Sequence, residues 1–124
     1  GDAALLAEPQ LLRRALANVL ANALRHARPE SVIELRARVE PEGDTVLEVI
    51  NEGAPLPPEQ LPRLFDRFYR ADAARSGEAG GSGLGLAIVQ AIMVLHGGSA
   101  RVWQDEGGRI SFALRFPRAQ DVRP

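Results

Sequence analysis

Two pairs of short segments with alternating apolar and polar residues constrain the fold of this chain more than any other feature. The first pair consists of SVIELRARVE and TVLEVI with PEGD between them, and the second consists of SARVWQ and RISFALRF with DEGG between them. Alternation with a period of two residues is typical of half-buried strands, and short turns rich in Pro, Gly and Asp join antiparallel neighbours. The sequence therefore predicts two β-hairpins, over residues 31–50 and 99–116.

Helical periodicity precedes the first hairpin. Residues 9–27 repeat apolar side chains at i, i+3, i+4 and i+7 spacing, which places them on one face of a helix. Pro9 suits the first turn, and Pro29 lies just beyond the last one. The sequence therefore predicts a helix over this range with one apolar face.

Two further helices are expected between the hairpins. The stretch PEQLPRLFDRFYR predicts a short helix that is broken near Pro62. A second one is expected from Leu84 to about His96, ended by Gly97-Gly98. Stretches without periodicity predict loops over residues 51–58 and 71–82. Hairpins with helices between them favour a two-layer α/β sandwich, in which helices cover one face of an antiparallel-rich sheet.

Composition excludes several classes of function. The 124 residues include no Cys and no Lys, which excludes disulfides, thiolate metal sites, Schiff bases and the lysine of a P-loop. A formal net charge of −1 gives no general attraction to nucleic acid, and no nucleic-acid partner is expected. The chain lacks a long apolar run and a signal peptide and begins at Gly1 without a Met, so we expect a cytoplasmic piece of a longer protein.

The glycine-rich stretch GGSGLGLAIV, at residues 80–89, leads directly into an apolar helix. Its spacing is not that of a dinucleotide-binding fingerprint, and the chain lacks the lysine that a P-loop or a protein-kinase glycine loop requires. What remains is a bend of backbone amides at a helix N-terminus, which can bind an anion without a cationic side chain. A flexible hinge before an ordinary helix is the alternative at this point.

Polar residues recur on the first predicted helix at helical spacing. Asn18, Asn22 and Arg25 form one stripe roughly opposite the apolar face, with His26 at its edge. Carboxamide oxygens can ligate Mg²⁺, and an arginine can donate to a phosphate. The stripe therefore indicates a magnesium–phosphate site, and a merely solvated helix face is the alternative.

Four motifs in a fixed order carry a resemblance to a known family. The segments LANVLANALRHA, VINEGAPLP, FDRFYR and GGSGLGLAIV resemble the N box, first glycine box, F box and second glycine box of bacterial two-component sensor histidine kinases. The likeness is to their catalytic ATP-binding domain, which has the Bergerat fold, and it extends from Gly1 to about Pro117. It implies a mixed, largely antiparallel sheet of about five strands with about three helices, a domain over residues 1–118 and a tail over 119–124.

The resemblance also implies ligands and site residues. It implies that ATP and Mg²⁺ bind, that Asn22 ligates the metal and that residues 71–80 form a lid. The implied catalytic residues are Asn18, Asn22, Arg25 and Arg70. The implied nucleotide-binding residues are Asn22, Arg25, His26, Asn51, Gly53, Leu56, Phe68, Tyr69, Arg75, Gly81, Ser82, Gly83, Leu84 and Gly85.

Three positions of this chain bear on how such a site would work. Related ATPases have a water-activating Glu where Asn18 stands, and a carboxamide cannot act as that base, so phosphoryl transfer is favoured over hydrolysis. Asn51 replaces the usual adenine-binding Asp, and its amide can still accept and donate hydrogen bonds. This Asn-x-Gly version resembles the branch of metal-responsive sensor kinases. Pro55 replaces a usual Gly, which stiffens the loop.

The resemblance implies partners that lie outside this chain. Neither His26 nor His96 fits the phosphoacceptor pattern, so the acceptor histidine is expected on an upstream dimerisation domain of the same protein. A response regulator, a homodimeric parent in the bacterial inner membrane and a monomeric isolated domain are also implied. Two alternatives stay open: a free-standing serine kinase of the anti-sigma type, and a non-catalytic nucleotide-sensing module of the same fold.

Overall fold

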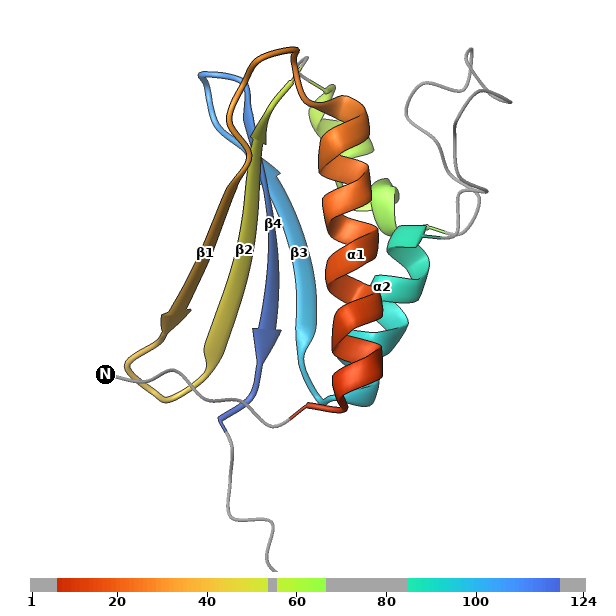
Figure 1. The fold of residues 1–124 in the computed structure, drawn as a ribbon, viewed down its shortest axis with the longest axis vertical. Helices are drawn as coiled ribbons and strands as arrows, with labels where there is room; N and C mark the ends of the chain where they lie inside the picture. Colours follow the sequence, from red (N-terminus) through yellow and green to blue (C-terminus); the bar gives the residue numbers. More distant parts are fainter. Residues whose placement is uncertain (1–6, 54–55, 67–84, 119–124) are drawn as a thin grey trace, which may run out of the picture.

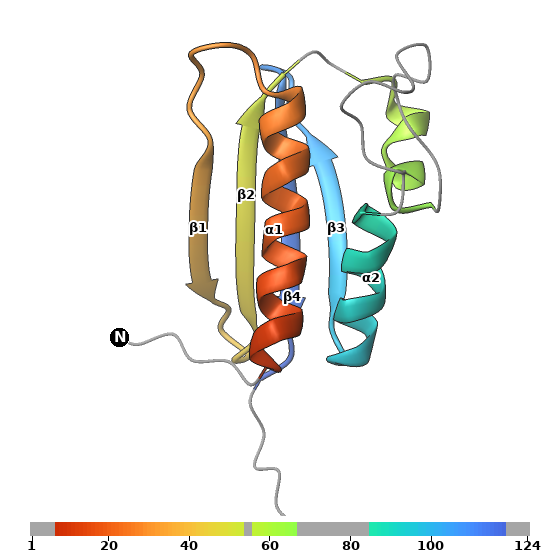
Figure 2. The same cartoon turned by 45° about the vertical axis from the view of Figure 1, so that its right-hand side comes forward.

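The computed structural model describes residues 7–53, 56–66 and 85–118, which form two layers (Figures 1 and 2). The first layer is an antiparallel sheet in the order β1-β2-β4-β3. Its strands are β1 (Glu34–Val39), β2 (Thr45–Glu52), β3 (Ser99–Gln104) and β4 (Arg109–Phe116). The second layer holds the helices α1 (Pro9–His26) and α2 (Gly85–Leu95), which lie on one face of the sheet. The predicted two-layer sandwich is confirmed.

Helix α1 begins and ends close to where the sequence predicts. The carboxylate of Glu8 accepts hydrogen bonds from the backbone N–H groups of Gln10 and Leu11, and Pro9 occupies the first turn. At the other end, the last helical residue is His26, and the Ala27 N–H still bonds within the helix. Capping at one end and Pro29 beyond the other therefore fix the length of this helix.

Both predicted hairpins are present. β1 pairs with β2 across the turn at residues 40–44, and β3 pairs with β4 across residues 105–108. Gly43 and Gly108 adopt positive φ values of 106° and 88° in these turns, a conformation that favours glycine. The two hairpins join through β2 and β4, which pair from Thr45↔Phe116 to Glu52↔Arg109. This pairing makes one continuous sheet from two local units.

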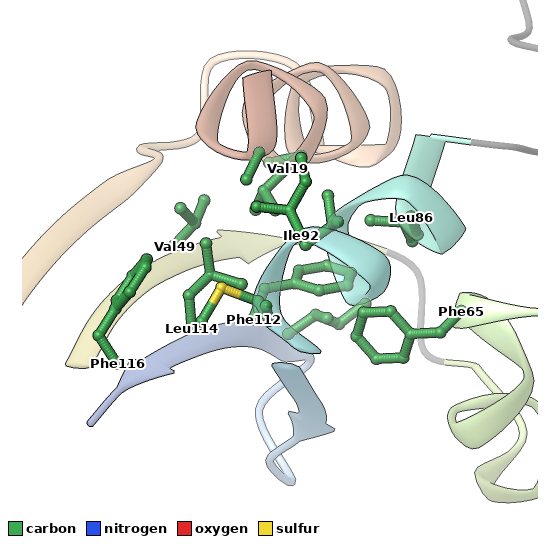
Figure 3. Close-up of a cluster of buried hydrophobic side chains, with 13 residues drawn as sticks. Val19, Val49, Phe65, Leu86, Ile92, Phe112, Leu114 and Phe116 are labelled. Carbon is green, nitrogen blue, oxygen red and sulfur yellow. The ribbon is translucent and has the colours of Figure 1, made fainter. Parts of the chain in front are cut away.

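The hydrophobic core lies between the helices and the inner face of the sheet (Figure 3). Side chains from both helices meet the inward residues of the two central strands, and full burial of each large side chain contributes roughly 1.5–3 kcal/mol. Phe65 extends this core, with its ring edge-on to Phe112 at a centroid separation of 6.3 Å. The buried members are Ala15, Val19, Ala23, Val49, Phe65, Leu86, Val89, Ile92, Met93, Ile110, Phe112, Leu114 and Phe116.

Several expectations need correction. The described residues contain four strands, all antiparallel, where about five in a mixed sheet were expected. Residues 51 and 52, expected in a loop, belong to β2 because they pair with β4. The expected break near Pro62 is confirmed, but the described part of that stretch forms two short 3-10 helices, Pro58–Gln60 and Pro62–Phe65, because Pro62 lacks the N–H that a continuous helix needs there. The described residues hold two α-helices and two 3-10 helices, in keeping with the expected helical layer of about three helices.

The C-terminus of α2 is closed by hydrogen bonds and by two glycines. The Gly98 N–H donates to the Met93 carbonyl at 2.8 Å, and Gly97 has a positive φ of 75°. A Cβ on Gly98 would lie 1.9 Å from the Arg115 carbonyl oxygen, so this position requires glycine. The predicted glycine ending is therefore confirmed, and close approach of β4 explains the second glycine.

Ion pairs occupy the outward face of the sheet. Arg38 contacts both Glu40 and Glu48 at 2.8 Å, and the Glu48 side chain is only 8% exposed. The hydrogen bond from Arg38, supported by one from Arg115, lowers the pKa of the Glu40 carboxyl below its ordinary value. The same hydrogen bond to Glu40 is the main reason that the pKa of Arg38 is raised. In the part of the chain that the structure describes, no helix is long and apolar enough to cross a membrane.

Candidate functional site

Asn18 and Asn22 lie on the side of α1 that borders α2. Both side chains are half-buried, and the Asn18 Nδ2 donates to the Gly85 carbonyl oxygen at 3.2 Å. The sequence predicted these residues opposite the apolar face, but they flank that face, because α2 packs beside α1 along this side. The consequence is that two carboxamides lie near the beginning of α2 instead of on an open surface.

Gly85 is the first residue of α2, at the end of the glycine-rich stretch. A Cβ at this position would lie 3.9 Å from the Asn18 Cγ, which is an ordinary contact, so the close packing does not itself demand glycine. Unpaired N–H groups at a helix N-terminus carry a partial positive charge that favours an anion. Asn18 thus lies beside the first described turn of α2, where its amide donates to the Gly85 carbonyl.

The last turn of α1 is tied to the end of β2. Arg25 and His26 are exposed in this turn, and Ala27 forms an isolated antiparallel bridge with Gly53. A Cβ on Gly53 would lie 2.6 Å from the His26 carbonyl oxygen, so only glycine allows this approach. The Arg28 side chain strengthens the tie with a 2.8 Å ion pair to Glu52. The polar end of α1 and the end of β2 therefore lie together.

Asn51 is the most unusual polar residue that the structure describes. It is 2% exposed, and its Nδ2 is buried without a hydrogen-bond partner, the one such side-chain atom among the described residues. Leaving a buried donor unpaired costs about 1–3 kcal/mol. The neighbouring Glu52 side chain is 42% exposed while Asn51 is buried, because consecutive strand residues point to opposite faces of a sheet. An unpaired buried amide indicates a missing hydrogen-bond partner, and a ligand can supply one.

Gln104 was not among the residues that the sequence indicated. It ends β3, and its side chain makes two hydrogen bonds with the backbone of Leu56: Oε1 accepts from the N–H at 3.1 Å, and Nε2 donates to the carbonyl at 2.5 Å. The two residues are 48 positions apart, and no spacing in the sequence joins them. Leu56 itself packs against the hydrophobic core.

Asn18, Asn22 and Asn51 offer neutral carboxamides, none of which can act as a general base. Carboxamides neither take nor give a proton near neutral pH, so they can hold a ligand or a metal ion but cannot activate water. The described residues contain no group of three or more His, Cys, Asp or Glu side chains that could hold a metal ion. The predicted site residues that lie outside the described part of the chain are Phe68, Tyr69, Arg70, Arg75, Gly81, Ser82, Gly83 and Leu84.

Comparison with known sequences places this chain among ATPases and kinases. The family described as "Histidine kinase-, DNA gyrase B-, and HSP90-like ATPase" matches residues 7–120. The chain is 48% identical over 117 residues to the sensor protein CzcS of Cupriavidus metallidurans, which covers 94% of this chain and 24% of that protein. It is 47% identical over 112 residues to the sensor histidine kinase CusS of Escherichia coli strain K12, covering 89% and 22%. The chain thus spans about a quarter of the length of these relatives.

Solved structures agree with the sequence comparison. The mycobacterial sensor histidine kinase MprB superposes with a TM-score of 0.81 at 31% identity, over 94% of this chain and 78% of that one. Full-length ShkA, solved in complex with AMPPNP, gives 0.79 at 28% identity, over 97% and 24%. Because the family matches almost the whole chain and its relatives are close to half identical, this chain belongs to the histidine kinase-, DNA gyrase B- and HSP90-like ATPase family.

Proposed function

We propose that this chain is the catalytic domain of a sensor histidine kinase, which binds Mg²⁺-ATP and donates the γ-phosphoryl group to a histidine on another domain. The observation that carries the proposal is the buried, unpartnered Nδ2 of Asn51, at the same end of the molecule as the polar turn of α1. Family membership and the named sensor kinases among the relatives support it.

The base of the nucleotide would bind at Asn51. A carboxamide offers a donor and an acceptor side by side, which matches the ring nitrogen and amino group of adenine. The free Nδ2 fits this assignment, because a ring nitrogen would give it the partner that it lacks. The usual Asp of the family would only accept, so Asn51 exchanges charge assistance for a second hydrogen bond.

The phosphates and the metal ion would bind between α1 and the beginning of α2. The Asn22 side-chain oxygen is the proposed Mg²⁺ ligand, with phosphate and water oxygens completing the shell, and Arg25 is the proposed phosphate contact. When bound, Mg²⁺ would neutralise phosphate charge during transfer. Arg70, Arg75 and residues 81–85 are proposed to contact the phosphates as well.

The chemistry of Asn18 favours transfer over hydrolysis. Its Nδ2 donates to Gly85, so this side chain fixes the start of α2 against α1. As a carboxamide it cannot take a proton from water, so bound ATP would be hydrolysed slowly. Its γ-phosphoryl group would instead be transferred when another domain supplies a nucleophile. We propose that this nucleophile is a histidine of an upstream dimerisation and phosphoacceptor domain.

We extend the proposal to the parent protein. Residues 1–118 would be the catalytic domain and residues 119–124 a tail, and the isolated domain would be monomeric. The parent would be a homodimeric kinase of the bacterial inner membrane that passes its phosphoryl group to a response regulator. The Asn51-x-Gly53 pattern and the identity to CzcS and CusS support placing it in the metal-responsive branch.

A titration with a fluorescent ATP analogue tests the proposal. We expect saturable, Mg²⁺-dependent binding, and at least about tenfold weaker binding for Asn22→Ala, since loss of a metal-site residue typically costs about 10–100-fold. Gln90→Ala is the matched control, because Gln90 is an exposed carboxamide on α2 and should bind normally.

Two results would contradict the proposal. Absence of saturable binding, or Asn22→Ala binding as tightly as the unchanged domain, would argue against the magnesium–nucleotide site. If the domain binds ATP but the parent protein forms no phosphohistidine, the non-catalytic reading of the fold would be favoured instead.

A further inference from the structure

We propose that Gln104 is a positioning residue for the base-binding end of the site, acting through the backbone of Leu56. This inference rests on the proposed function, because it concerns how the pocket around Asn51 keeps its shape. Gln104 would not touch the nucleotide. Its role would be to hold Leu56 in place at this end of the sheet.

The sheet register brings Gln104 into line with Asn51. Asn51 of β2 and Gln104 of β3 are both paired with Ile110 of β4, on opposite sides of it. The three residues therefore form one row across the sheet, and their side chains point to the face that carries the helices. A ligand bound at Asn51 would thus lie on the same face of the sheet as Ile110 and Gln104.

Two described residues, Gly53 and Leu56, lie between β2 and the 3-10 helices and contact the β3–β4 hairpin. The chain leaves β2 at Gly53, whose N–H donates to the Gly108 carbonyl at 3.3 Å, and it reaches Gln104 at Leu56. The described residues on either side of positions 54 and 55 are therefore each held by a hydrogen bond, Gly53 to Gly108 and Leu56 to Gln104. Because the second hydrogen bond is made by a side chain, its strength depends on which residue occupies position 104.

Glutamine suits this anchor for a chemical reason. Its carboxamide has the same donor–acceptor pair as a peptide group, so it bonds the N–H and the carbonyl of Leu56 as a neighbouring strand would. The two residues that follow, Pro57 and Pro58, have no N–H and cannot donate to a turn around Leu56. Gln104 therefore supplies hydrogen bonds to both backbone groups of Leu56.

The inference predicts that loss of the two hydrogen bonds loosens Leu56 and widens the base pocket. Gln104→Met keeps the length of the side chain and removes both hydrogen bonds, whereas Gln104→Glu keeps the acceptor for the Leu56 N–H and loses the donor. Arg101→Ala is the control, since Arg101 is exposed on β3 and an odd number of residues from Gln104, on the opposite face.

The experiment combines two measurements on the whole chain. Amide hydrogen exchange reports on the Leu56 N–H, and competition against a fluorescent ATP analogue gives the affinities for ATP and for ITP, in which an oxygen replaces the adenine amino group. We expect faster Leu56 exchange and about fivefold to tenfold weaker ATP binding for Gln104→Met, equivalent to the loss of about one hydrogen bond. The preference for ATP over ITP should fall, and Gln104→Glu should lie between the two.

The outcomes separate this inference from the proposed function. Unchanged ATP affinity and ATP/ITP preference in Gln104→Met, with the unchanged domain binding ATP, would overturn the role of Gln104 alone. An equal loss of ATP and ITP binding would also overturn it, because it would indicate a general loss of structure. If the unchanged domain binds neither nucleotide, the proposed function fails, and the inference fails with it.

Discussion

The two ends of this molecule each hold a polar side chain that is partly or fully buried, and they differ in whether its nitrogen atoms have hydrogen-bond partners within the protein. At the lower end of Figure 1, α1 begins, α2 ends and the chain turns from β1 to β2; we call this the hairpin end, after the β1–β2 turn. His96, which follows α2, donates from Nδ1 to the Ile92 carbonyl at 2.8 Å and accepts from the Glu8 N–H at 3.0 Å through Nε2. Its ring also packs edge-on against Phe116. At the other end, which we call the site end, Asn51 is more deeply buried and its amide nitrogen has no partner.

This difference separates residues that hold the fold from residues that await a ligand. Histidine is the more reactive residue type of the two. Both ring nitrogens of His96 are hydrogen-bonded within the protein, so this side chain stabilises the fold. Asn51 has an unreactive side chain, but its buried amide nitrogen is unpaired, and this lowers the stability of the folded chain. Unsatisfied hydrogen-bonding capacity is therefore a better guide to the site here than reactivity.

The largest loss of stability should come from the hairpin end. Gly98→Ala places a Cβ against the Arg115 carbonyl at 1.9 Å, which forces β4 and the end of α2 apart. We expect a loss of about 3 kcal/mol in the free energy of unfolding, measured by urea denaturation. Gly97→Ala is the matched control: its Cβ would be 3.7 Å from Pro117, and only its positive φ should cost about 1–2 kcal/mol. Equal losses for the two variants would contradict the steric account.

A smaller effect should follow from removing the histidine. His96→Phe keeps an aromatic ring against Phe116 and leaves the Glu8 N–H without its protein acceptor. We expect a loss of about 1 kcal/mol in unfolding free energy, since water can replace an exposed hydrogen bond, with nucleotide affinity unchanged. A fall in ATP affinity without a loss of stability would break the distinction between the two ends.

The smallest effect should come from Glu40, also at the hairpin end. Its pKa is lowered in the folded state, mainly by the hydrogen bond from Arg38, so its contribution to stability is present above the ordinary pKa of 4.5 and is lost as the pH falls through the lowered value. Glu40→Gln should lower the Tm by a few degrees at most at pH 7, because the pair is at the surface. Thermal melts at pH 7 and at acidic pH should show this difference shrinking; a difference that grows with acidity would contradict it.

The sequence predicted local structure well and distant contacts poorly. The strand ranges 99–104 and 109–116 follow from alternation alone. The contact between Gln104 and Leu56 could not be predicted, because it depends on how two hairpins dock and not on any local period.

The position of Asn18 shows the same limit within a helix. Periodicity placed it away from the apolar face, but the neighbouring α2 decides what lies on each flank of α1. In the stretch that begins at Pro58, the sequence predicted the break near Pro62, but not that the described residues on both sides of it would form 3-10 helices. The roles proposed for residues 67–84 remain predictions from the family resemblance.

Asn51→Leu tests the central claim most directly, through unfolding free energy and ATP affinity measured on the same protein. If the buried amide is kept for a ligand, replacing it by an apolar side chain of similar size should raise the unfolding free energy by about 1 kcal/mol and weaken ATP binding at least about tenfold. The two properties should therefore change in opposite directions. Loss of stability together with unchanged ATP affinity would contradict the account, because it would make Asn51 a structural residue like His96.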